Sequence, residues 1–250
     1  RGLSRLLRWS RASASEILSH YFDDWRLAMP AAGMGPTVWG LPPEAPGTGL
    51  AALAYSIRHL VQSGRPAGGS GALVDAIRGS FEAAGGRIRY ETRVESLLLS
   101  DGLVAGVVLS DGTHLRADTV VAACDPSDVF VRWLRNDAPP SASRLMRQWQ
   151  RRSPPMGYES KVDAVLGGIP VPAAAGGLRE HIPGFDPVGH TMVVSPSPDE
   201  LIQAHQRRAY GQVADRPTLL IDVPSLVDPL MSPATDRHVL SLEVLITPYD

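Results

Sequence analysis

Apolar positions recur with helical spacing between two Gly-Gly pairs, Gly68–Gly69 and Gly85–Gly86. The recurring positions are Leu73, Ile77, Phe81 and Ala84. Spacings of four and three residues place these side chains on one face, so the pattern predicts an amphipathic helix. We expect this helix to end at the second pair, Gly85–Gly86, because glycine adopts the left-handed conformation of a helix C-terminus without a steric cost.

Beyond residue 86 the pattern changes to one that is typical of β-strands. The runs that predict strands are residues 87–90, 94–99, 103–109 and 113–116. Asp101–Gly102 and Asp111–Gly112 separate the last three runs, and an Asp-Gly pair between apolar runs indicates a tight hairpin turn. These segments therefore predict a β-meander, in which each strand pairs with the next.

A continuous apolar run, Thr119 to Ala123, follows the meander. Because it does not alternate with polar residues, it predicts a strand buried on both faces, as in the parallel sheet of an α/β domain. Ligands of open α/β sheets bind beyond the carboxyl ends of the strands. The candidate ligand contacts at this strand end are therefore Ala122, Ala123, Cys124 and Asp125. Sheet packing followed by a turn at Pro126 is an equally open interpretation.

The flanking segments predict a second, mixed set of elements. The predicted helices are residues 1–22, 50–61, 127–134, 141–150 and 199–210. The predicted strands are residues 161–166, 191–195, 218–223 and 238–246. Proline and glycine crowd residues 30–48 and 170–187, so we expect both of these segments to be loops.

Composition excludes several classes of protein. A formal net charge of −2 argues against a nucleic-acid-binding protein, which would show a basic excess. The single cysteine, Cys124, allows no internal disulfide, and no histidine pair has metal-ligand spacing, so we expect no metal site. We expect a cytoplasmic protein. The arginine-rich residues 1–11 leave peripheral membrane contact, or a presequence, open beside an internal helix.

The segment from Gly64 to Pro126 resembles the central part of the phytoene desaturase-like flavoproteins, which are relatives of the amine oxidases. The resemblance rests on the run GRPAGGSGAL, the helix and meander that follow it, and VVAACDP before the next helix. Residues 157–162, 224–229 and 238–242 also resemble segments of this family. The resemblance implies an α/β fold, α+β overall, with a partial FAD-binding Rossmann-like domain and a mixed sheet-and-helix substrate domain. It divides the chain into residues 1–63 (substrate domain), 64–130 (FAD-binding domain) and 131–250 (substrate domain).

The same resemblance implies FAD as the cofactor and assigns candidate contacts to it. Val94 would meet the adenine edge with its backbone N–H and C=O groups, and the alternative is an ordinary strand valine. Gly68 and Gly69 would let the backbone approach the flavin, and the alternative is a tight turn that starts a helix. No residue is identified as a catalytic acid or base. The five tryptophans are interpreted as core or interface residues.

The resemblance also predicts the activity. We expect an FAD-dependent oxidoreductase that acts on a small apolar substrate, isoprenoid or carotenoid-like. The chain begins with Arg1 and contains no G-x-G-x-x-G turn in a βαβ setting, so we expect an internal fragment that is inactive by itself. The alternative is a non-catalytic binding or interaction module built on a flavoprotein fold. The oligomeric state is not assigned by the sequence.

Overall fold

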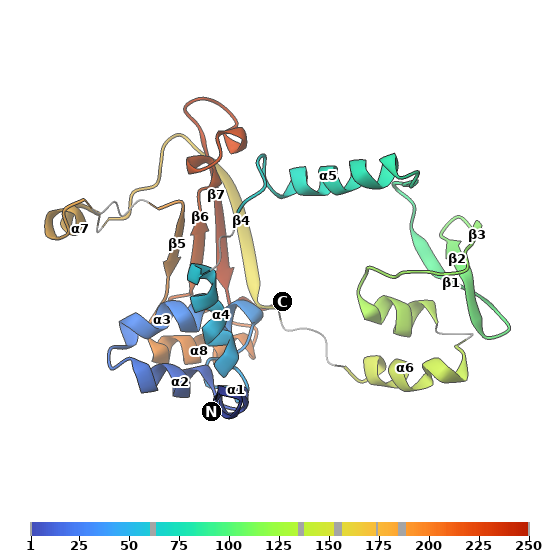
Figure 1. Cartoon of the computed structure of the whole chain (residues 1–250), viewed down its shortest axis with the longest axis horizontal. Helices are drawn as coiled ribbons and strands as arrows, with labels where there is room; N and C mark the ends of the chain where they lie inside the picture. The colour runs from blue at the N-terminus through green and yellow to red at the C-terminus, as the bar shows by residue number, and fades with distance from the viewer. Residues whose placement is uncertain are drawn as a thin grey trace. The chain divides into compact units, whose positions relative to one another are not determined.

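The structure, a computed structural model, describes residues 2–60, 64–134, 138–152, 157–173, 175–184 and 189–249. The helices are α1 (Gly2–Trp9), α2 (Ala14–Tyr21), α3 (Trp25–Met34), α4 (Gly49–Leu60), α5 (Ser70–Ala83), α6 (Ser143–Gln150), α7 (Ala175–His181) and α8 (Pro198–Arg208), with the π-helix η2 (Asp128–Trp133) and the 3₁₀ turns η1 (Thr37–Trp39), η3 (Pro140–Ala142), η4 (Pro224–Leu226) and η5 (Pro229–Met231) (Figure 1). The strands are β1 (Val94–Ser100), β2 (Leu103–Leu109), β3 (His114–Arg116), β4 (Glu159–Leu166), β5 (Thr191–Val194), β6 (Leu219–Asp222) and β7 (His238–Leu245).

The chain forms two compact units. Unit 1 combines Arg1–Ile77 with Pro155–Asp250, and unit 2 is Arg78–Pro154. Both units combine helices with antiparallel sheets, so the mixed α/β class that the sequence predicts is confirmed. Across the described ranges, no helix has the length and apolar character that crossing a membrane requires.

Unit 1 is built on a four-stranded antiparallel sheet with the strand order β4-β7-β6-β5. The two long strands, β4 and β7, pair without a break from Glu159–Leu245 to Leu166–His238. Helices α2, α3 and α8 gather near one end of this sheet (Figure 1). Helices α2, α3 and α4 also contact one another, so the helices form a layer of their own.

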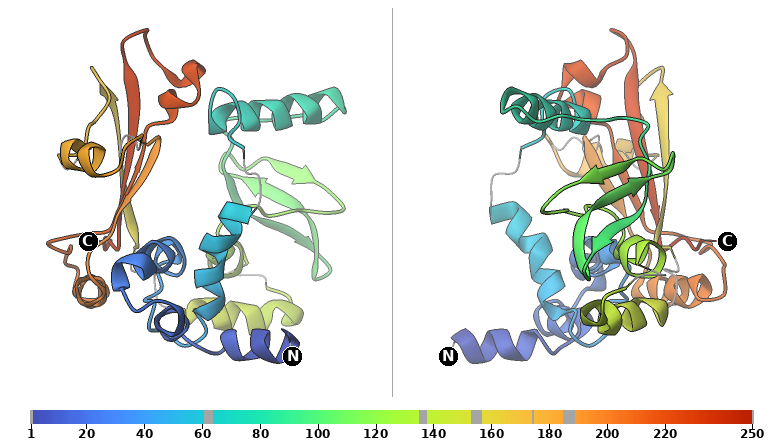
Figure 2. Two further views of the ribbon diagram at one scale, coloured as in Figure 1. Left: turned by 60° about the vertical axis from the view of Figure 1, so that its left-hand side comes forward. Right: turned by 90° about the vertical axis from the view of Figure 1, so that its right-hand side faces the viewer.

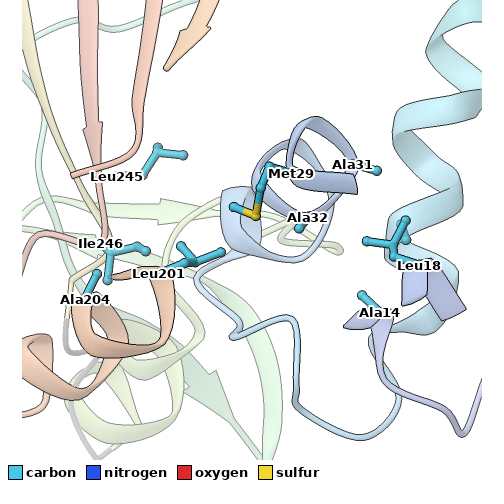
Figure 3. Close-up of a cluster of buried hydrophobic side chains, with 10 residues drawn as sticks. Ala14, Leu18, Met29, Ala31, Ala32, Leu201, Ala204, Leu245 and Ile246 are labelled. Atoms are coloured by element: carbon cyan, nitrogen blue, oxygen red, sulfur yellow. The ribbon is translucent and has the colours of Figure 1, made fainter. Parts of the chain in front are cut away.

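One buried core joins these helices to the end of the sheet. Its members are Ala14, Leu18, Met29, Ala31, Ala32, Ala52, Leu201, Ala204, Leu245 and Ile246 (Figure 3). They come from α2, α3, α4, α8 and the last residues of β7. Four of the ten core residues are alanines from α2, α3 and α4, whose small side chains let helices approach closely. Burial of this apolar surface is the main stabilising term of unit 1.

Unit 2 contains the predicted β-meander, with the strand order β1-β2-β3 (Figure 2, right). Ser100 pairs with Leu103, so Asp101 and Gly102 form the whole turn between β1 and β2. Their φ angles are both positive, 52° and 76°, as the hairpin turn of type I′ requires. At Gly106 a side chain would overlap the carbonyl group of Leu115, so glycine permits the pairing of β2 with β3.

Two predicted strands are wrong. Residues 87–90 and 119–123 are not strands, and most of their residues are exposed, with Val121 87% exposed. A strand is stable only when a neighbouring strand takes up its backbone hydrogen bonds, and no strand within the described residues pairs with either segment. The apolar pattern of residues 119–123 therefore does not lead to burial here.

Two predicted loops and one predicted helix are also corrected. Helix α3 extends into residues 30–48 with Pro30 inside it, because burial of Met29 and Met34 offsets the hydrogen bond that proline cannot make. Helix α7 lies within residues 170–187. The single helix expected over residues 1–22 is two helices, since Ser13 forms a capping box with Glu16 and starts α2 anew.

Candidate cofactor site

A hollow of about 570 Å³ opens in unit 2 beside the start of β1. It is lined by Arg93, Val94, Glu95, Asp128, Arg132 and Trp133. The first three residues begin β1, and the last three belong to the π-helix η2, which packs against that strand. Its volume is within the range of small-molecule sites. The hollow thus places the sequence-predicted residue Val94 beside one aromatic ring and two guanidinium groups.

The backbone of Val94 faces away from the rest of its sheet. Val94 is opposite Leu109, and the N–H group of Leu109 donates to Thr113, on the far side of β2 from β1. In the neighbouring pair, Ser110 donates to the carbonyl group of Arg93 over 3.0 Å. Because hydrogen-bonded and non-hydrogen-bonded pairs alternate in antiparallel sheets, the N–H and C=O groups of Val94 point away from β2. They are free of the β1–β2 ladder and can meet the polar edge of a ligand.

Helix η2 is wound as a π-helix, and residues from both of its ends, Asp128 and Trp133, line the hollow. The N–H group of Leu134 donates to the carbonyl group of Val129 over 3.1 Å, which is the five-residue step of a π-helix. Residues five apart then lie nearly above one another, so Asp128 and Trp133 share the face that lines the hollow. An α-helix would turn them toward different sides. Such π-turns are frequent at functional sites.

The charges around the hollow are balanced. Asp128 and Arg132 form an ion pair one turn apart, and Arg93 and Glu95 add one charge of each sign on the strand. The Arg132 side chain is 63% exposed, so this pair contributes little to stability. The guanidinium group of Arg132 stays at the exposed rim of the hollow, where it can bind a phosphate group.

Asp125 acts as the N-cap of the helical segment that leads into η2. Its side chain accepts a 2.7 Å hydrogen bond from the N–H group of Ser127. Hydrogen bonds from Ser127 hold the pKa of Asp125 below its ordinary value, and the positive charges of Arg152 and Arg132 lower this pKa further. The aspartate therefore positions the helix that carries Trp133. Ala122, Ala123 and Cys124 lie in the exposed extended segment just before this cap.

Gly68 and Gly69 lie in unit 1, at the turn before α5. The N–H group of Gly68 donates to Asp228 over 2.6 Å, and the same carboxylate accepts from Leu230 over 3.0 Å. The two glycines therefore form a turn that is held to η5, and their backbone groups belong to another unit than Val94.

A second ion pair holds the residues just before this turn. Arg65 reaches Asp222 at the end of β6, and both of these side chains hydrogen-bond Thr191. Burial alone would raise the pKa of Asp222. Hydrogen bonds from Arg65 and Thr191, together with the charge of Arg65, lower it below its ordinary value. The predicted motif G-R-P-x-G-G is thus held in unit 1 by two carboxylates, Asp222 at the end of β6 and Asp228 at the start of η5.

The sequence interpretation named only Val94 of the hollow and missed five residues, which are Arg93 and Glu95 on the strand side and Asp128, Arg132 and Trp133 on η2. A tryptophan near the end of a predicted helix reads as a core residue, and the spacing of five indicates a shared face only in a π-helix. The signal that could have pointed to the η2 residues is the order of elements along the chain. The family resemblance assigns Val94, at the start of the meander, to the cofactor, and η2 is the next helical element after the meander.

Comparison with known proteins shows the family to which the chain belongs. The family model described as "Flavin containing amine oxidoreductase" matches residues 4–162. This match covers more than half of the chain, and the chain belongs to that family of flavoproteins.

Individual relatives agree with this assignment. "Pyridine nucleotide-disulfide oxidoreductase domain-containing protein 2" of Rattus norvegicus is 29% identical over 95% of this chain and 41% of its own length. "Phytoene desaturase (neurosporene-forming)" of Rhodobacter capsulatus is 30% identical over 70% of this chain and 31% of its own length. The crystal structure of an oxidoreductase from Methanosarcina mazei shares the fold, with a TM-score of 0.63 and 17% identity over 95% of this chain and 48% of that one. The chain spans less than half the length of these relatives.

Proposed function

We propose that the chain is part of an FAD-dependent oxidoreductase and that the hollow beside Val94 receives the adenine end of FAD. The observation that carries this proposal is the backbone of Val94, whose N–H and C=O groups point away from β2 beside a hollow that contains an aromatic ring. An adenine edge presents one donor and one acceptor side by side, which is the complement of a single extended residue. The membership of a flavin-containing family supports the choice of cofactor.

The residues around the hollow fit such a group. Ala122 and Ala123 are exposed and lie in the same unit, but they are not part of the lining of the hollow. Arg93 and Arg132 supply positive charge for phosphate groups, and Trp133 supplies an apolar wall. The lining thus combines an aromatic ring with two guanidinium groups, whose charge is balanced by Asp128 and Glu95.

When bound, the flavin supplies the redox chemistry, since it can accept a hydride equivalent from a C–H bond of the substrate. The residues of this chain contribute binding and orientation. Val94 would fix the adenine through its backbone, and the η2 helix would hold the arginine and the indole in place. The cap at Asp125 would keep this helix at the end of residues 119–123.

We propose an apolar substrate for the whole protein. Support comes from the relative named as a phytoene desaturase and from a hollow of about 270 Å³ in unit 1. The aromatic and aliphatic side chains that line this hollow are Leu18, Phe22, Trp25, Met29 and Leu201. Ser15, Ser19, Asp23 and Glu44 also line this hollow, so the support comes from its apolar part, which would contact a hydrocarbon substrate.

The proposal is tested by the flavin content and FAD affinity of the full-length protein. Val94→Pro removes the N–H donor, and the sheet tolerates proline there because that group is outside the ladder. We expect FAD to bind roughly tenfold more weakly to this variant, which is about the effect of one lost hydrogen bond in a buried site. The matched control Val94→Ile keeps the donor and should bind FAD as the parent does. A purified full-length protein that contains no flavin and takes up none would contradict the proposal.

A further inference from the structure

Trp133 is the one aromatic side chain among the described residues that line the hollow beside Val94. Trp133 is the last residue of η2. It is partly buried and lines the hollow together with Val94. It is five residues from Asp128, and only the π-winding of η2 turns both side chains to this face. A winding that sets one indole into a hollow of ligand size calls for a functional explanation, because π-helices are rare.

We infer that Trp133 is the stacking wall for the adenine ring in this hollow. A purine has one flat apolar face on each side and a polar edge. An extended backbone can hydrogen-bond to the polar edge, and an indole ring can stack on one of the flat faces. Both kinds of partner occur in this hollow and come from different elements, β1 and η2. The inference rests on the proposed function, since it assigns the adenine to the same hollow.

Two guanidinium groups line the hollow beside Trp133, and the carboxylates of Asp128 and Glu95 balance their charge. Arg132 is next to it in the chain and is positioned by its ion pair with Asp128. Arg93 lines the strand side of the same hollow. A guanidinium group within reach of the stacked ring can bind the phosphate that follows the ribose. The site therefore fits an adenine nucleotide such as ADP better than FMN, which lacks the adenine.

Tryptophan fluorescence tests this inference with ADP as the probe and the whole chain as the protein. Trp149 provides a matched control. It lies on α6 in the same unit, has Arg152 4.6 Å from its ring centroid, and does not line the hollow. Trp133→Phe keeps an aromatic wall, so this variant should bind ADP within about threefold of the parent and lose most of the quenching by ADP. Trp149→Phe should keep both the affinity and the quenching.

A second variant removes the wall. Trp133→Leu should bind ADP roughly tenfold or more weakly, whereas Trp149→Leu should bind it as the parent does. FMN should be bound no better by the parent chain than by Trp133→Leu. Circular dichroism of each variant shows whether it folds, and the phenylalanine pair tests the inference even if a leucine variant does not.

The outcomes separate this inference from the proposed function. Unchanged quenching in Trp133→Phe, or no binding of ADP by the parent chain, would overturn the role of Trp133. If the full-length protein contains flavin and its Trp133→Leu variant retains FAD at full affinity, the proposed function stands and this inference fails. If ADP binding depends on Trp133 but the full-length protein has no flavin, the nucleotide site stands and the oxidoreductase proposal fails.

Discussion

The two units of the chain bury their apolar side chains to very different extents. In unit 1, the core side chains of α2, α3 and α8 belong to one buried cluster with Leu245 and Ile246, and several of them are almost completely inaccessible (Figure 3). In unit 2, the buried apolar residues among those described are Leu109, Leu134 and Met146, while Leu103 is 73% exposed. The first unit thus rests on a core and the second on tight turns and strand pairing. The candidate cofactor site lies on the less buried unit.

This difference has a functional meaning. A ligand that fills the hollow beside Val94 would add apolar contacts to a unit that has few of its own. Ligand binding stabilises the folded state by a free energy that grows with the logarithm of the ratio of ligand concentration to Kd. We therefore expect unit 2 to gain more order from an adenine nucleotide than unit 1 does.

The largest expected effect of a mutation is in the core of unit 1. Leu201 is 1% exposed, so Leu201→Ala leaves a cavity and should lower the free energy of unfolding by about 2–5 kcal/mol. The control in unit 2, Leu103→Ala, should change it by about 0.5 kcal/mol or less, because that side chain is already in contact with solvent. Urea unfolding measures both. If both variants lost the same free energy of unfolding, the difference in burial between the two units would have no effect on stability.

The next effect concerns the turns and pairing of unit 2. Gly106→Ala places a side chain against the carbonyl group of Leu115 at a φ of 145°, a conformation that glycine alone adopts readily. We expect a loss of about 1–3 kcal/mol that is confined to the β2–β3 pairing. Ala105→Gly serves as a control on the adjacent position. Hydrogen exchange at the backbone amides of the meander should become faster in Gly106→Ala alone. If these amides stay as protected in Gly106→Ala as in the parent, the β2–β3 pairing does not require glycine at this position.

Sequence patterns predicted the elements that depend on near neighbours. The apolar stripe ending at Gly85 marked α5, and the two Asp-Gly pairs marked the turns of the meander. Residues 119–123 failed because burial depends on which strand lies beside a segment, and the pattern does not carry that information. Trp133 was missed because its approach to Val94 is long-range and requires a π-winding that local spacing does not predict.

A pH-dependent effect is expected from His205 in unit 1. Burial and, to a smaller extent, the nearby charge of Arg208 together lower the pKa of His205 to about 4. Both ring nitrogens are buried without a hydrogen-bond partner in the described part of the chain. The unfolded chain, with a histidine pKa near 6.5, binds the proton more readily. Stability is therefore complete above about pH 6.5 and falls as the pH drops toward 4.

The size of this effect is moderated by partial exposure of the ring. We expect a loss of about 1–2 kcal/mol between pH 7 and pH 4.5, after allowance for solvent screening. Urea unfolding at several pH values measures it. His205→Gln should flatten this dependence, whereas the exposed control His114→Gln should leave it unchanged. A dependence that survives in His205→Gln would assign it to other groups.

The smallest expected effect concerns the Gly68–Gly69 turn. Asp228→Ala removes the acceptor for two backbone N–H groups, those of Gly68 and Leu230. The site is exposed, so we expect a loss of about 1 kcal/mol, comparable to removal of a helix cap. Asp228→Asn keeps an acceptor oxygen and should lose less. Thermal unfolding of the two variants compares them, and equal stability of Asp228→Ala and the parent would show that the turn is held by other contacts.

The central claim is that the adenine end of FAD binds beside Val94 in unit 2. Amide hydrogen exchange of the full-length protein, with and without FAD, tests it most directly. Exchange at Val94 and across η2 should become slower on addition of FAD or ADP and remain unchanged with FMN. FAD binding that leaves Val94 and η2 unprotected, with slower exchange confined to residues of unit 1, would contradict the claim.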